Sequence, residues 1–151
     1  MKVHLRQIPQ GETLHLEGEE DVSKWELENA GAEPLGPLFY SLDIGVSDGG
    51  IFATGSLQLR VKMECVKCLE SFELDLGLYD FAIQKELEGT ELVDLTPEAR
   101  EDIHLALPAY PHCDATGERT CPASFPEAPS SVSEPTGATP WGELDQLKNK
   151  D

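Results

Sequence analysis

The chain has 151 residues, with 29 acidic and 11 basic side chains and a formal net charge of −18 at pH 7. This length suits one domain with a real hydrophobic core. The negative charge argues against non-specific binding to nucleic acid, because such binding needs many Lys and Arg residues to neutralise phosphates. It favours basic protein partners, or RNA contacts that are few or indirect.

The chain shows no sign of membrane insertion or export. Its apolar stretches fall short of the ~18 residues that a membrane-spanning helix needs. The N-terminus alternates polar and apolar residues and lacks the apolar core of a signal peptide. We therefore expect a cytoplasmic protein, whose cysteines stay reduced.

The N-terminal part reads as short strands followed by irregular structure. Apolar residues alternate with polar ones in residues 1–16, and Gly11 breaks this stretch into a hairpin-like unit. Residues 17–36 are acidic and rich in turn formers, with a possible helical turn at 21–25. We expect Trp25 to anchor this segment in the core.

The clearest sheet signal lies between residues 37 and 83. Residues 38–44 alternate, Asp48-Gly49 is a strong hairpin turn, and a long return strand covers 51–65. The alternating pattern resumes at 69–81, so the sequence predicts a second hairpin whose tip is the Cys-x-x-Cys segment. One face of the return strand is apolar: Leu57, Leu59, Val61, Met63 and Cys65.

A helix is predicted at residues 95–107. Thr96 is a good N-cap, Pro97 suits the first helical position, and Pro108 ends the helix. The chain then continues to Cys113, so the helix can deliver this cysteine to the hairpin tip. The sequence thus predicts a single α+β domain over residues 1–121, with one main helix and an antiparallel sheet that either stays open or curls toward a barrel.

The C-terminal residues differ in composition. Residues 122–140 are dominated by Pro, Ser, Ala, Thr and Glu, which predicts a disordered linker. In residues 141–151, Trp141, Leu144 and Leu147 recur at three-residue spacing. This spacing is typical of a short helical motif that docks on a partner or on its own domain. The alternative is a frayed end.

The four cysteines are the strongest candidates for a functional site. Cys65 and Cys68 form a Cys-x-x-Cys turn, and Cys113 and Cys121 follow far downstream. Two such pairs can close a tetrahedral zinc site, although the second pair lacks the two-residue spacing of a zinc ribbon. Free thiols and disulfides remain as alternatives, and disulfides would need an oxidising compartment.

The order of these features resembles a known family. A long strand ends in Cys-x-x-Cys-Leu at residues 65–69, the helix ends in Leu-Ala-Leu-Pro at 105–108, and the chain closes with Pro-Trp-x-x-Leu-x-x-Leu-Lys at 140–148. This order is similar to the bacterial YceD family of large ribosomal RNA subunit accumulation proteins, over roughly residues 38–148. Family members often have a Cys-x3-Cys-x3-Cys run, in which Gly117 replaces the middle cysteine here.

The resemblance implies a role in the accumulation or processing of large-subunit ribosomal RNA, with ribosome assembly components as partners. We expect a non-enzymatic accessory factor with a structural zinc ion, because four thiolates leave no open position on the metal. Arg60, Lys62 and Lys67 are the candidate phosphate contacts, with a solvated strand face as the alternative. The alternative function is an acidic protein–protein adaptor without direct RNA contact.

Overall fold

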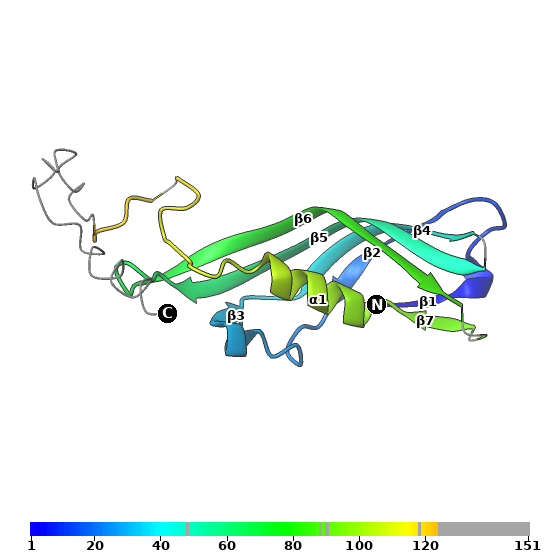
Figure 1. Ribbon diagram of the computed structural model, residues 1–151, viewed down its shortest axis with the longest axis horizontal. Coiled ribbons are helices and arrows are strands. Elements are labelled where there is room, and N and C mark those ends of the chain that lie inside the picture. The colour runs from blue at the N-terminus through cyan, green and yellow to red at the C-terminus, as the bar shows by residue number, and fades with distance from the viewer. Residues whose placement is uncertain (48, 88, 90, 118, 124–151) are drawn as a thin grey trace, which may run out of the picture.

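The computed structural model describes residues 1–47, 49–87, 89, 91–117 and 119–123 (Figure 1). They form an α+β fold in which every described strand pair is antiparallel. The elements are β1 (Lys2–His4), η1 (Leu5–Gln7), β2 (Leu14–Glu20), η2 (Leu27–Ala30), β3 (Ala32–Pro34), β4 (Leu38–Ser47), β5 (Gly50–Glu64), β6 (Ser71–Glu86), β7 (Leu92–Asp94) and α1 (Thr96–Ala106). The predicted disordered linker after Ala123 and the predicted motif at 141–151 lie outside the described residues.

The main sheet is elongated and open. Its strands lie in the order β2-β4-β5-β6, and β3 pairs with the far half of β5 beside β4. β5 and β6 run along most of the molecule, and the sheet curves over α1 (Figure 1). The edge strands β2 and β6 do not pair with each other within the described ranges. The barrel option is therefore wrong. A sheet only four strands wide is narrower than the roughly five strands of the smallest barrels.

The alternating pattern of β5 sets the position of the core. The side chains of Leu57, Leu59, Val61 and Met63 are at most 3% exposed, whereas the residues between them are exposed. This confirms the predicted apolar face. Helix α1 covers the same side of the sheet through Ala99 and Ile103, which are fully buried.

Both predicted hairpins are present. Ser47 of β4 pairs with Gly50 of β5, and Gly49 has a φ of +78°, the left-handed conformation that a tight hairpin turn needs. Residues 65–70 join β5 to β6, so the Cys-x-x-Cys segment forms the tip of the second hairpin.

The prediction of an N-terminal hairpin-like unit is wrong. β1 pairs with β7 and β2 pairs with β4, so the two strands around Gly11 belong to different sheets. Each strand reaches a better apolar partner far along the chain, which local alternation cannot reveal. At 21–25 the structure has a hydrogen-bonded turn, with the Trp25 N–H donating to the Val22 carbonyl at 2.9 Å. Trp25 is 4% exposed, as expected of a core anchor.

Helix α1 begins at its predicted cap residue, one position earlier than expected. Thr96 is the first helical residue rather than the N-cap, and its N–H donates to the Asp94 carboxylate at 2.9 Å. The helix ends at Ala106, ahead of the predicted stop at Pro108. Neither α1 nor the short helices of the described ranges have the length and apolarity that a membrane crossing requires.

Candidate metal centre

Four sulfur atoms from two distant segments meet at one end of the molecule. Cys65 and Cys68 come from the β5–β6 tip, and Cys113 and Cys121 come from the segment after α1. All four Sγ atoms lie within 4.8 Å of one another, and all four cysteines are free thiols. The Sγ atoms of Cys68 and Cys113 lie 3.7 Å apart, and those of Cys65 and Cys121 lie 4.0 Å apart.

These separations suit one tetrahedral metal ion. Metal–sulfur bonds of about 2.3 Å place the sulfur atoms of a tetrahedral site about 3.8 Å apart. Cys65, Cys113 and Cys121 are at most 4% exposed, and Cys68 is half-buried. The cluster also stands apart from the main core, with Phe72 packed against both. The four cysteines therefore could hold a metal ion.

The backbone of the tip is shaped to hold its two thiols together. The Cys65 N–H donates to the Glu70 carbonyl at 3.0 Å, and the Leu69 N–H donates to the Cys65 carbonyl at 2.9 Å. Leu69 has a φ of +62°, a left-handed conformation that is uncommon for a non-glycine residue. This tight turn brings Cys68 back over the end of β5.

Backbone dipoles and burial act in opposite directions on these thiols. Burial alone would raise the pKa of Cys65, but N–H groups of Cys113, Cys68 and Lys67 directed at its sulfur lower that pKa to about 6. Burial raises the pKa of Cys113 to about 12, and it also raises the pKa of Cys121. One thiolate is thus favoured in place, and a divalent cation at the centre would favour ionisation of the others.

Contacts outside the sulfur atoms also join the tip to the downstream segment. Each links one residue of the tip with one of the segment: the Val66 N–H donates to the Pro111 carbonyl at 2.9 Å, Lys67 Nζ lies 3.1 Å from an Asp114 oxygen, and Arg119 pairs with Glu70. Sequence reasoning missed these pairs, because nothing in the local pattern relates residues so far apart.

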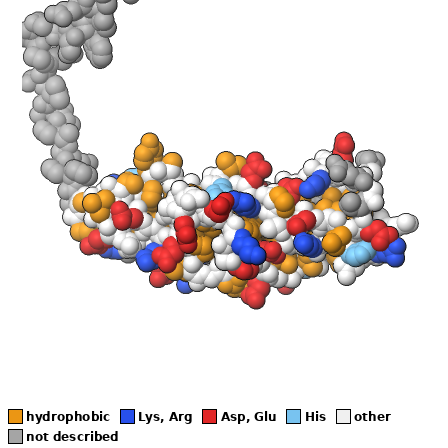
Figure 2. Space-filling model, turned by 90° about the horizontal axis from the view of Figure 1, so that it is seen from below, with side chains coloured by type: hydrophobic (Ala, Val, Ile, Leu, Met, Phe, Trp, Pro, Cys, Tyr) orange, Lys and Arg blue, Asp and Glu red, His pale blue; other side chains and the backbone are white. Residues whose placement is uncertain are grey.

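The three candidate phosphate contacts are all engaged in ion pairs. Arg60 pairs with Asp75 at 2.6 Å and Lys62 with Glu33 at 3.1 Å, both on the exposed face of the sheet. Lys67 belongs to the metal-site tip. On the face seen in Figure 2, acidic and basic side chains lie interspersed without a basic patch. Such exposed pairs are weak and exchange partners readily.

Histidines do not join the cluster. His112 Nδ1 lies 2.5 Å from the carbonyl oxygen of Tyr110, and His104 Nε2 lies 3.0 Å from that of Trp25. Among the described residues, the four cysteines are the only group of His, Cys, Asp or Glu side chains arranged to hold a metal ion.

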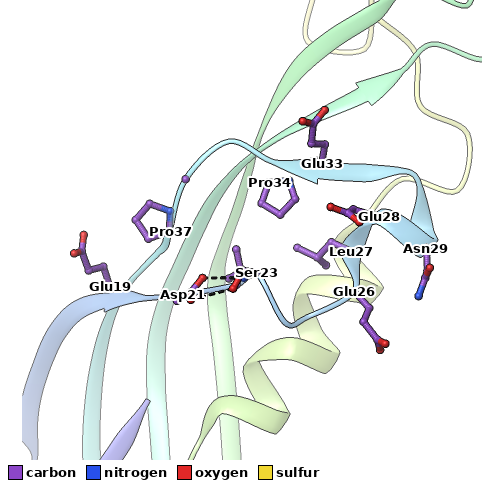
Figure 3. Close-up of a pocket in the computed structure, with 12 residues that line it drawn as sticks. Glu19, Asp21, Ser23, Glu26, Leu27, Glu28, Asn29, Glu33, Pro34 and Pro37 are labelled. Atoms are coloured by element: carbon purple, nitrogen blue, oxygen red, sulfur yellow. Dashed lines mark hydrogen bonds between the residues drawn. The ribbon is translucent and has the colours of Figure 1, made fainter.

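A second feature, an open acidic pocket of about 920 Å³, lies between the end of β2, η2 and β3 (Figure 3). Asp21 in this pocket accepts hydrogen bonds from Ser23, and the carboxylates of Glu19, Glu26 and Glu33 point away from one another. Its carboxylates do not converge on one point. The acidic composition of residues 17–36 was its only signal in the sequence.

The other predicted contact residues, Trp141, Leu144 and Leu147, lie outside the described residues. Comparisons of the chain with models of protein families, with curated proteins and with solved structures found no match.

Proposed function

We propose that the chain is a non-enzymatic accessory factor in large ribosomal subunit biogenesis, which supports the accumulation or processing of large-subunit ribosomal RNA. One observation carries the proposal. The Cys-x-x-Cys tip and the downstream cysteines, whose order resembles the YceD family, come together within 4.8 Å in space. The proposal thus joins the sequence resemblance to a site that the same residues can build.

The proposed metal is zinc in a structural role. Four thiolates in a tetrahedral arrangement suit Zn²⁺, which has no redox chemistry and no geometric preference of its own. Four protein ligands leave no position for water or substrate, in contrast to a catalytic zinc site. The ion would clip the segment after α1 to the end of the β5–β6 hairpin.

RNA contact would use the basic side chains near this end of the sheet, of which Arg60 and Lys62 are exposed and Lys67 is half-buried. Arg60 and Lys62 lie two residues apart on the outer face of β5, and Lys67 lies in the tip. Because their present partners are carboxylates on the surface, phosphate groups can replace those partners at modest cost. Such contacts would position RNA without reading its sequence.

A second candidate function is a protein–protein adaptor without direct RNA contact. The ion pairs favour it, since Arg60, Lys62 and Lys67 already have carboxylate partners. The net charge of −18 also favours a basic protein over a nucleic acid.

Affinity capture from cells that express the full chain would test the proposal and separate the two candidates. We expect large-subunit RNA to be enriched over small-subunit RNA in the captured fraction. Under the RNA-contact reading, the double variant Arg60→Gln, Lys62→Gln loses this RNA, while the matched Lys24→Gln control retains it. Lys24 is exposed and lies in the turn before η2.

Nuclease treatment gives the other arm of the test. Partner proteins that stay bound after RNA digestion would favour the adaptor reading. Captured material with no enrichment of large-subunit RNA or its proteins would contradict both readings.

A further inference from the structure

The β6 strand leaves one edge of the sheet open. It pairs with β5 from Ser71 to Glu86 and with no other strand of the described part. From Ser71 to Leu78 its register with β5 is continuous, and the first irregularity comes near Gly55 and Leu57 of β5. A strand edge of this length presents backbone N–H and C=O groups to which another extended chain can add.

The inner face of this edge is incompletely covered. Of the four inward side chains of this edge, Leu76 is 8% exposed, and Phe72, Leu74 and Leu78 are half-buried. Their cross-strand partners on β5 are at most 3% exposed, because β5 has neighbours on both sides. An added strand would cover the β6 side chains if its own inward residues were apolar.

The outer face of the same edge is acidic. Glu73 lies opposite Lys62 in the register, but Lys62 Nζ bonds to Glu33, and Glu73 makes no ion pair within the described residues. Asp75 follows two positions later, and its exposed carboxylate pairs with Arg60 at 2.6 Å. Outward Lys or Arg residues on an added strand would lie beside these carboxylates.

We propose that the β6 edge from Phe72 to Leu78 binds an extended segment of a basic protein partner, in which apolar residues alternate with Lys or Arg. The alternation follows from the pleat, since successive side chains of the added strand face opposite sides of the sheet. The inference does not depend on a bound zinc ion.

A second copy of the chain fits this edge less well. Antiparallel pairing of two β6 strands would bring Glu73 and Asp75 of both copies together, and each copy carries a net charge of −18. Like charges across adjacent strands are destabilising. The opposite edge strand, β2, has only 7 residues, compared with 16 in β6.

A synthetic peptide of alternating valine and lysine, capped at both ends, would test the proposal on the full chain. The control peptide has the same composition, with its valines and lysines in two blocks. We expect at least ~10-fold tighter binding of the alternating peptide, because only this peptide places apolar and basic side chains on opposite faces of a strand. Equal affinity for the two peptides would show attraction by net charge alone and would overturn the proposal.

Amide hydrogen exchange identifies the edge that the peptide uses. In the free protein, every second amide of β6 between Phe72 and Leu78 faces away from β5 and should exchange quickly. The alternating peptide should slow these amides. Slowing confined to β2 would contradict the proposal, as would pairing of β6 between two copies of the chain.

Charge variants complete the test. Glu73→Gln should weaken binding of the alternating peptide by up to about fivefold, the usual range for an opposite-charge pair across strands. The matched variant Glu19→Gln, exposed on β2, should leave binding unchanged. If Glu19→Gln weakened binding and Glu73→Gln left it unchanged, the peptide would lie on the β2 edge, and the proposal would be overturned.

Discussion

Replacing Cys113 with Ser removes one of the four sulfur atoms that converge at the end of the β5–β6 hairpin. We predict that this change releases the segment after α1 from the tip while the sheet stays folded. The reason is that the cysteine cluster lies apart from the main core, which has its own buried side chains on β4, β5 and α1.

The remaining attachment can be estimated from the contacts. Without the metal clip, two hydrogen bonds join the tip to the segment among the described residues: the Val66 N–H donates to the Pro111 carbonyl at 2.9 Å, and the Cys113 N–H is directed at the Cys65 sulfur. The backbone hydrogen bond contributes about 1 kcal/mol net, and the half-buried Lys67–Asp114 and exposed Arg119–Glu70 ion pairs beside it add little. The Val66 amide should then be protected from exchange by only about tenfold or less.

Amide hydrogen exchange followed by NMR measures this directly. In the wild-type chain with zinc, the Val66 amide should be protected far more strongly, because zinc binding by structural sites contributes on the order of 10 kcal/mol in isolated fingers. In Cys113→Ser, the protection of Val66 should collapse while that of Leu42 and Leu57 in the core stays unchanged. Thr116→Ser, in the same exposed loop, is the matched control.

Either of two results would refute this reasoning. Unchanged protection of Val66 in the variant would mean that the cysteines do not hold the segment. Loss of protection throughout the sheet would mean that the cluster is part of the core and not a separate clip.

Three further predictions concern the sheet and its surface. A Cβ at Gly55, where φ is +154°, would lie 2.1 Å from a backbone oxygen of β4. Gly55→Ala should therefore lower the free energy of unfolding by about 2 kcal/mol or more in urea titrations. A Cβ at Gly36 would meet open space, so the matched Gly36→Ala should change the free energy of unfolding little. Leu42→Ala at a fully buried position should cost about 2–5 kcal/mol by the same assay, and a value under ~1 kcal/mol would contradict the assigned core. The Asp43 carboxylate raises the pKa of His15, so any stability from this pair is present at low pH and is lost as the pH rises through that raised pKa; an NMR titration should show the His15 pKa falling toward its ordinary value in Asp43→Asn.

The sheet could be predicted from the sequence where its pattern is local. The alternation in β5 correctly placed the side chains of Leu57, Leu59, Val61 and Met63 in the core, and the Asp-Gly turn located the first hairpin. The pairing of β1 with β7 could not be predicted, because it joins residues about ninety positions apart through backbone bonds that leave no local signal. The start of α1 differed by one residue: Thr96 is the first helical residue, and its N–H donates to the Asp94 carboxylate.

The candidate metal centre was predictable in its ligand types but not in its surroundings. Thiols in a Cys-x-x-Cys turn indicated a metal site, and the helix before Cys113 explained how a second pair could arrive there. The pairing of Lys67 with Asp114 depends on the folded path of the downstream segment. The sequence therefore grouped Lys67 with Arg60 and Lys62 as candidate phosphate contacts, and in the structure each has a carboxylate partner.

The most direct test of the proposed zinc site is the metal content of the protein. It is measured by mass spectrometry on untagged protein purified under reducing conditions without added zinc. We expect one zinc ion per chain, bound by Cys65, Cys68, Cys113 and Cys121. We expect this zinc ion to be lost in Cys113→Ser. A wild-type chain with no bound metal and four titratable thiols would contradict the proposed zinc site.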